Sequence, residues 1–256
     1  MAKYSLHGGH NNIVQGANYG GRKEHIMDRL VKDAVAAKLR ALGHTVYDDT
    51  DETGSTQAQN LSNIVRNCNS HDVDLVISFH LNAYNGTANG VEVCYYDQQA
   101  LAAKVSAQLS KDIGWANRGA KERRYGNERL YVLAETKAPA ILIELGFIDN
   151  EADMAKWDVD KIANSIVYAL TGQRVGGSGN GDIATVSPKQ NIIQSGAFSP
   201  YETPDVMSAL TSLKMTATFI LKPNGETYFI SEPTSDKQLD AMKEYLYRKD
   251  WWYEVK

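Results

Sequence analysis

Two histidines and two glutamates stand at places in the sequence from which their side chains could meet. They are His10, Glu24, His80 and Glu144. Zinc hydrolases hold the metal with two imidazoles and one carboxylate, leave a fourth position for water, and use one further carboxylate to move protons. These residue types therefore predict a zinc-dependent hydrolytic site, provided that the fold brings them together.

The segment 74–83 indicates how the fold could do this. Its nearly continuous apolar run is typical of a strand that is buried on both faces of a parallel sheet, and His80 comes at the end of this run. Open α/β sheets keep their chemistry at the carboxyl ends of such strands. We therefore expect a central strand that delivers His80 to this edge.

The other three residues are predicted at the same edge. His10 comes just after a first predicted strand, and Glu144 ends a strand at 140–144. Glu24 opens a predicted helix at 24–42 and shares an apolar stripe of that helix, which turns its carboxylate toward the sheet. Two imidazoles and two carboxylates are thus expected to converge.

Strands and helices alternate through the first two thirds of the chain. The predicted strands are 3–6, 44–47, 74–83, 91–96, 129–133 and 140–144. The predicted helices are 24–42, 57–69, 98–113, 151–156 and 161–170. Alternation of this kind favours an α/β fold, with a twisted, mostly parallel sheet and helices on both faces. We assign residues 1–172 to this catalytic domain.

The composition changes after Gly172. Residues 173–189 are rich in glycine and polar side chains and lack periodicity, which predicts a flexible linker. In residues 190–256 the predicted order is strand, helix, strand, strand, helix, strand, with a hairpin signal at Asn224-Gly225. This order is typical of a small α+β ferredoxin-like (βαββαβ) domain.

The last predicted strand, 251–255, separates two tryptophans by alternation. Trp251 is expected in the core and Trp252 on the open face of the sheet, although both could be core residues. An exposed Trp252 with Tyr228 or Phe229 nearby would suit the face of a sugar. Because the charges of this domain nearly balance, we expect stacking and hydrogen bonding to dominate its binding.

Composition argues against several other classes of protein. The net charge of −4 and the pI near 5.9 argue against a nucleic-acid partner. The two cysteines, Cys68 and Cys94, lack the spacing of a disulfide scaffold or a thiolate metal site. No apolar run approaches a membrane helix, and the N-terminus lacks the apolar core of a signal peptide, so we expect no membrane insertion. The oligomeric state is not predicted.

Several separated motifs, taken in order, resemble those of the zinc-dependent N-acetylmuramoyl-L-alanine amidases of the amidase-3 family. The motifs are Gly9-His10 with Gly16-Ala17, Lys23-Glu24, 77–83, 90–96 and 143–150. The resemblance covers residues 3 to 171. It implies that His10, Glu24 and His80 are the zinc ligands and that Glu144 is the catalytic glutamate.

The first motif departs from the family pattern, which has an aspartate before Gly-His and a glycine pair after it. Here His7-Gly8 precedes Gly9-His10, and Asn11-Asn12 follows. Either histidine could therefore be the first ligand, and the distance to Gly16 favours His10. Asn82, in the His80 strand, either contacts substrate or ends the strand.

The C-terminal part, from about Asn191, is similar to the small wall-targeting domain of lysins from bacteriophages that infect Bacillus. Together the resemblances imply a phage endolysin that cleaves the amide between N-acetylmuramic acid and L-alanine with zinc-activated water. Its partners would be bacterial peptidoglycan and a secondary wall polymer. Such an enzyme is made in the host cytoplasm without a signal peptide and reaches the wall after a holin opens the membrane.

Two alternatives use the same residues differently. A zinc peptidase acting on the stem peptide of peptidoglycan would need the same chemistry, and only the family resemblance separates it from an amidase. A non-catalytic wall-binding protein would have lost a ligand or the glutamate, whereas all four positions are filled here.

Overall fold

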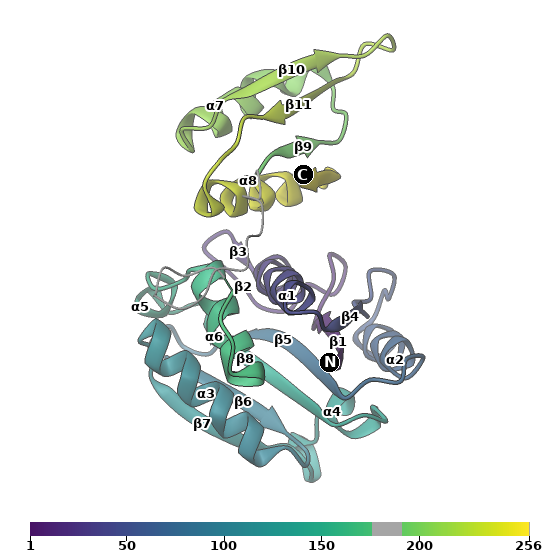
Figure 1. Cartoon of the computed structure of the whole chain (residues 1–256), viewed down its shortest axis with the longest axis vertical. Helices are drawn as coiled ribbons and strands as arrows, with labels where there is room; N and C mark the ends of the chain where they lie inside the picture. Colours follow the sequence, from purple (N-terminus) through teal and green to yellow (C-terminus); the bar gives the residue numbers. More distant parts are fainter. Residues whose placement is uncertain (176–190, 256) are drawn as a thin grey trace. The chain divides into compact units, whose positions relative to one another are not determined.

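The computed structural model describes residues 1–175 and 191–255 of the chain. The chain divides into two compact units, Met1–Gly177 and Ser178–Lys256, which Figure 1 shows in different colours along the sequence. Each unit has a hydrophobic core of its own. The predicted linker at 173–189 falls almost wholly outside the described residues, so it stays a prediction together with the domain boundaries.

The first unit is built on a six-stranded sheet with the order β4-β1-β5-β8-β6-β7. The strands are β1 Lys3–Gly8, β4 Thr45–Asp48, β5 Leu75–Asn82, β6 Val91–Tyr95, β7 Asn117–Glu122 and β8 Ala140–Phe147. Four neighbouring strands of this sheet, β4, β1, β5 and β8, run parallel to one another. Strand β6 is antiparallel to β8 and parallel to β7. The expected mostly parallel sheet is thus confirmed.

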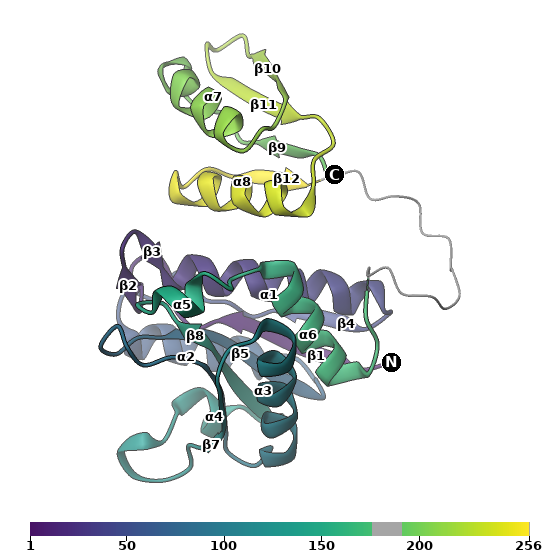
Figure 2. The same ribbon diagram turned by 90° about the vertical axis from the view of Figure 1, so that its left-hand side faces the viewer.

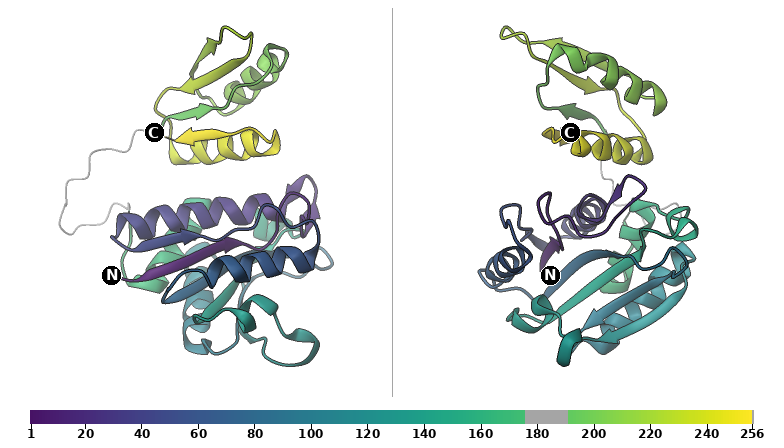
Figure 3. Two further views of the ribbon diagram at one scale, coloured as in Figure 1. Left: turned by 90° about the vertical axis from the view of Figure 1, so that its right-hand side faces the viewer. Right: turned by 180° about the vertical axis from the view of Figure 1, so that it is seen from behind.

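Helices cover both faces of this sheet. They are α1 Glu24–Ala41, α2 Gln57–Cys68, α3 Gln99–Ile113, α4 Tyr131–Glu135, α5 Glu151–Met154 and α6 Val159–Thr171. Apolar residues of α1, α3 and α6 share one core with the sheet, and those of α2 and α4 share a second core on its other face. Figure 2 shows α1 and α6 along the same face, and Figure 3 shows α2 along the opposite one.

One strand of the first unit was predicted in the wrong place. Residues 129–133 do not form a strand, because Val132 and Leu133 lie in helix α4 and pack into the core beneath α2. The place beside β6 is taken by β7, Asn117–Glu122, which was not predicted from the sequence. This edge strand is polar and half exposed, so it carries no apolar signal.

A short hairpin crosses the long loop after β1. It consists of β2, Asn18–Tyr19, and β3, Arg22–Lys23, and it leads directly into α1. Between β7 and α4 a single turn of 3₁₀ helix spans Gly126–Glu128. Among the described residues, no helix is both long and apolar enough to cross a membrane.

The second unit has the predicted ferredoxin-like order. It contains β9 Ile193–Ser195, a 3₁₀ turn at Pro200–Glu202, α7 Thr203–Ser212, β10 Ala217–Leu221, β11 Thr227–Ser231, α8 Asp236–Arg248 and β12 Tyr253–Val255. The sheet order is β10-β11-β9-β12, and every pair is antiparallel. Both helices share a core with Ile193 and Phe229, so they cover one face of the sheet. The Asn224-Gly225 hairpin is confirmed, and Ser235 forms a capping box at the start of α8.

Candidate functional site

Three of the four predicted site residues form one cluster. His10 follows β1, Glu24 is the first residue of α1, and His80 lies near the end of β5, yet one ligand atom from each lies within 4.8 Å of the others. The two imidazole rings meet edge to face, with centroids 5.0 Å apart. Two imidazoles and a carboxylate at this spacing are a suitable donor set for a transition metal.

Glu24 is held in place by several donors. Its Oε1 accepts the backbone N–H of Leu81 at 3.1 Å and lies 2.9 Å from Nδ1 of His80, while its Oε2 accepts the N–H of Ala17 at 2.7 Å. Burial alone would raise the pKa of Glu24, but the hydrogen bond from His80 and the nearby imidazole charges lower it below its ordinary value. The carboxylate is therefore charged and fixed before any metal arrives.

The same hydrogen bond affects His80. Burial by itself would lower the pKa of this imidazole, yet the bond to Glu24 and the charges of Glu24 and Glu144 raise it to about 9. A metal ion would take the place of this proton, because an imidazole binds metal in its neutral form.

Two glycines make room for the cluster. A Cβ at Gly9 would lie 1.9 Å from Nε2 of His80. A Cβ at Gly16, where φ is +70°, would lie 2.4 Å from Oε2 of Glu24 and 2.5 Å from Cδ2 of His10. Only glycine fits these positions. The backbone therefore forms a close cradle around the three side chains, as a metal site requires.

Glu144 lies beside this cluster. It is opposite His80 in the register of β5 and β8, so both side chains project from the same face of the sheet. Its Oε2 is buried and has no hydrogen-bond partner among the described residues. Burial raises its pKa to about 7, with further raising by the charges of Glu24 and Glu92 and lowering by His80 and Arg123.

His7 does not belong to the cluster. It is fully buried in β1, and its Nδ1 lies 3.7 Å from Sγ of Cys68. Burial lowers its pKa to about 3, so the imidazole is neutral. Of the two histidines that the sequence left open, the geometry places only His10 with Glu24 and His80. Asn82 pairs through its backbone, with its carbonyl accepting the N–H of Ile148 at 2.8 Å.

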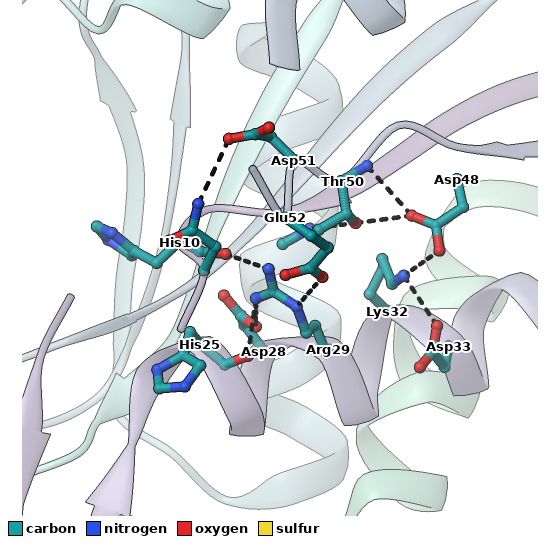
Figure 4. Close-up of polar contacts among 12 residues, drawn as sticks. His10, His25, Asp28, Arg29, Lys32, Asp33, Asp48, Thr50, Asp51 and Glu52 are labelled. Atoms are coloured by element: carbon teal, nitrogen blue, oxygen red, sulfur yellow. Dashed lines mark hydrogen bonds and ion pairs between the residues drawn. The ribbon is translucent and has the colours of Figure 1, made fainter. Parts of the chain in front are cut away.

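Helix α1 holds the backbone of the His10 loop through a buried arginine, which was not predicted from the sequence (Figure 4). Arg29 is 3% exposed, and its guanidinium donates to the carbonyl oxygens of His10 and His25 and to Glu52. The neighbouring Asp28, also buried, accepts the backbone N–H of Gly9 at 3.2 Å. Both charged groups therefore act on the backbone that carries the first candidate ligand.

Asn11 fixes the other side of this loop. Its Nδ2 donates to the carbonyl of Gly54 at 2.9 Å, and its Oδ1 accepts the backbone N–H of Val14 at 2.7 Å. The side chain is fully buried. Asn11 stands where the family pattern has a glycine, so in this chain a side-chain amide ties the loop to the segment between β4 and α2.

On the second unit, the structure separates the aromatic candidates. Trp252 is 64% exposed and Tyr228 is half-buried, whereas Phe229 is fully buried in the core. Phe229 is therefore withdrawn as a wall-binding candidate, because alternation along β11 turns its ring toward the helices. Trp251 lies just before β12 and is only half-buried, with its ring stacked on Phe198 at 4.7 Å between centroids.

Fold and site together define an α/β protein with a candidate metal centre of two imidazoles and one carboxylate at the edge of its sheet. The sequence profile described as N-acetylmuramoyl-L-alanine amidase matches residues 6–172, and the chain belongs to this family. The solved catalytic domain of the CD27L endolysin, which targets Clostridia difficile, is 29% identical. The match covers 69% of this chain and 100% of the CD27L domain, with a TM-score of 0.60.

A second profile, described as the PlyG cell wall binding domain, matches residues 212–255. The solution structure of that PlyG domain is 76% identical over 32% of this chain and 98% of its own length, with a TM-score of 0.26. An uncharacterized cell wall amidase of Bacillus anthracis is 34% identical over 123 residues, which are 43% of this chain. The matched part spans 22% of that relative's length.

Proposed function

We propose that the chain is a zinc-dependent amidase that hydrolyses the bond between N-acetylmuramic acid and L-alanine in bacterial peptidoglycan. The observation that carries this proposal is the Glu144 carboxylate, whose buried Oε2 has no partner among the described residues and which adjoins the three-residue cluster. In this proposal His10, Glu24 and His80 hold Zn2+. Membership of the N-acetylmuramoyl-L-alanine amidase family indicates which bond is cleaved.

Zinc bound at this cluster would lower the pKa of a water molecule and polarise the amide carbonyl. Glu144 acts as the general base that takes the proton from the attacking water. The same carboxyl then donates that proton to the leaving nitrogen of L-alanine. The buried Oε2 of Glu144 has no hydrogen-bond partner among the described residues, so this carboxyl is free to accept and return a proton.

The loop contacts serve this chemistry by fixing the ligands in advance. Glu24 is held by the N–H groups of Ala17 and Leu81, and the backbone of His10 is held by Arg29. Little conformational freedom is left to lose when the metal binds, which favours tight binding.

We further propose that the second unit binds the wall, with peptidoglycan or a secondary wall polymer as its ligand. Support comes from the match to a cell wall binding profile and from the exposed indole of Trp252. An aromatic ring buries the apolar face of a sugar while the hydroxyl groups stay in water. In this proposal the chain is an endolysin that reaches the wall after a holin opens the host membrane.

Digestion of purified peptidoglycan tests the reaction. Mass spectrometry should find new amino groups on L-alanine and intact lactyl groups on N-acetylmuramic acid, with no new reducing sugar. Removal of metal with a chelator should abolish the activity, and added zinc should restore it. New amino groups on residues beyond L-alanine would instead identify a peptidase, and new reducing ends would exclude an amidase.

A further inference from the structure

The face of the sheet that carries His80 and Glu144 continues beyond the site described above. In the antiparallel register of β6 and β8, Glu92 lies opposite Glu144, which in turn lies opposite His80. Residues opposite each other on neighbouring strands share a face, and the strands are about 4.8 Å apart. A row of polar side chains therefore runs from His80 on β5 through Glu144 on β8 to Glu92 on β6, toward β7.

Arg118, on β7, is aimed back along this row. Val91 pairs with Asn117 and Glu92 with Gly119, so Arg118 is the extra residue of a bulge. The centre of its guanidinium lies 5.0 Å from the centroid of the Phe147 ring, which belongs to β8. The side chain therefore reaches over β6 toward the strand of the catalytic glutamate, which is the kind of redirection that bulges beside active sites provide.

The guanidinium of Arg118 has hydrogen-bonding capacity to spare. Its Nε donates to Glu92 at 2.7 Å, and its two terminal amino groups have no hydrogen-bond partner among the described residues. Glu92 is 5% exposed and also lies 3.7 Å from Nη2 of Arg123, whereas the Arg118 side chain is 38% exposed. Glu92 and Phe147 thus hold a guanidinium that remains partly exposed to solvent.

We propose that Arg118 binds a free carboxylate of the stem peptide on the leaving side of the cut bond, and so selects substrates that carry it. A fixed guanidinium edge matches a carboxylate in a bidentate way. The lactyl carboxyl of the sugar is used up in the amide, so the nearest free carboxylates are those of the peptide beyond L-alanine. From the His80 strand β5 to β6, where Arg118 pairs with Glu92, the sheet spans two strand spacings, or about 10 Å. This distance corresponds to about three residues of an extended peptide. This inference rests on the proposed function.

Two soluble substrates that differ in one group provide the test. They are N-acetylmuramoyl-L-alanyl-D-isoglutamyl-L-lysinamide and its isoglutaminyl counterpart. In both, the γ-carboxyl of the second residue is used in a peptide bond and the C-terminus is an amide, so the α-carboxylate that becomes an amide in the counterpart is the free carboxylate by which they differ. Loss of a charge-assisted hydrogen bond should make Arg118→Gln about tenfold to a hundredfold lower in kcat/KM on the first substrate. On the amide the variant should stay within about threefold of wild type, because that substrate offers no charged group at this position for the guanidinium to pair with. Arg66→Gln, an exposed arginine on α2, is the matched control and should behave as wild type on both.

A structural role for Arg118 would give a different pattern. Equal losses on both substrates, or no loss on either, would overturn the proposal. If Arg118→Gln folds poorly by circular dichroism, Arg118→Lys is the second variant. Its ammonium group cannot pair with a carboxylate in the bidentate way, so its preference for the carboxylate substrate should be weaker than that of the wild type. A preference equal to that of the wild type would overturn the bidentate pairing. Failure of the wild type to cleave either substrate would contradict the proposed function itself, which is a separate result.

Discussion

Glu24 and Glu144 lie at the same edge of the sheet, but their pKa values are shifted in opposite directions because their hydrogen-bond partners and burial differ. The oxygens of Glu24 accept two backbone N–H groups and a hydrogen bond from an imidazole, which lowers its pKa. Glu144 has one buried oxygen with no donor among the described residues, and burial raises its pKa to about 7. A permanently charged carboxylate suits a metal ligand, whereas one that titrates near neutrality suits proton transfer.

Glu144→Gln tests this division of roles. The amide has nearly the same shape but cannot accept a proton, so the rate should fall at least about a hundredfold while zinc content stays near one ion per chain. His80→Ala is the comparison, since it should lose the metal. Near-normal turnover by Glu144→Gln would assign the proton transfer to another group.

We predict that zinc binding requires glycine at position 16, chiefly because a larger side chain there would collide with Glu24 and His10. Gly16→Ala would push a methyl group into Glu24 and His10 and should weaken zinc binding at least about tenfold, the scale of losing one well-placed contact. Gly20 is a matched control, because it also has a positive φ but a methyl group added there would have nothing within 4 Å. Equal zinc affinity in Gly16→Ala and Gly20→Ala, measured by titration with a competing chelator, would refute this.

At the scale of elements, helix α1 carries the loop as well as a ligand. Arg29→Met keeps the length of the side chain but leaves the buried carbonyl oxygens of His10 and His25 without their donor, so unfolding in urea should show a loss of about 2 to 3 kcal/mol. Arg40→Met, on the exposed end of the same helix, should cost less than about 1 kcal/mol. A similar small loss in both variants would mean that Arg29 does not support the loop.

The elements were predicted well where apolar periodicity was strong. The buried strand with His80 and the apolar stripe on α1 both appear in the structure. The failures have physical causes. Edge strand β7 is polar because half of it faces solvent, and Arg29 resembles an exposed helix residue until the loops pack over α1. Burial by segments distant in sequence leaves no local signal.

The candidate site shows the same limit. Sequence position was enough to bring His10, Glu24, His80 and Glu144 to one edge, because the carboxyl ends of parallel strands coincide. The redirection of Arg118 depends on a bulge in the β6–β7 register, and no local pattern of residues announces it. Phe229 was misplaced because alternation alone does not say which face the helices cover.

At the scale of the whole molecule, the proposed catalytic site and the proposed wall-binding surface belong to units with separate cores. A unit that holds the enzyme on the wall raises the local concentration of bonds to be cut without touching the chemistry. Loss of wall binding should therefore lower activity on walls and leave activity on small soluble substrates unchanged.

Trp252→Ala tests that separation. We expect weaker retention on purified walls, measured by pull-down in a Glu144→Gln background so that the wall is not digested, with a melting temperature near that of the parent because the indole is 64% exposed. Trp251→Ala is the contrasting variant. Its half-buried ring stacks on Phe198, so it should destabilise the second unit by about 2 to 3 kcal/mol, below the roughly 3 to 5 kcal/mol typical of fully buried aromatic residues. Unchanged retention by Trp252→Ala, or a large fall in its melting temperature, would reject Trp252 as part of the binding surface. In an otherwise wild-type chain, the same substitution should slow digestion of walls yet leave cleavage of a soluble muramoyl peptide at the parental rate, because the proposed zinc ligands and Glu144 all lie in the first unit.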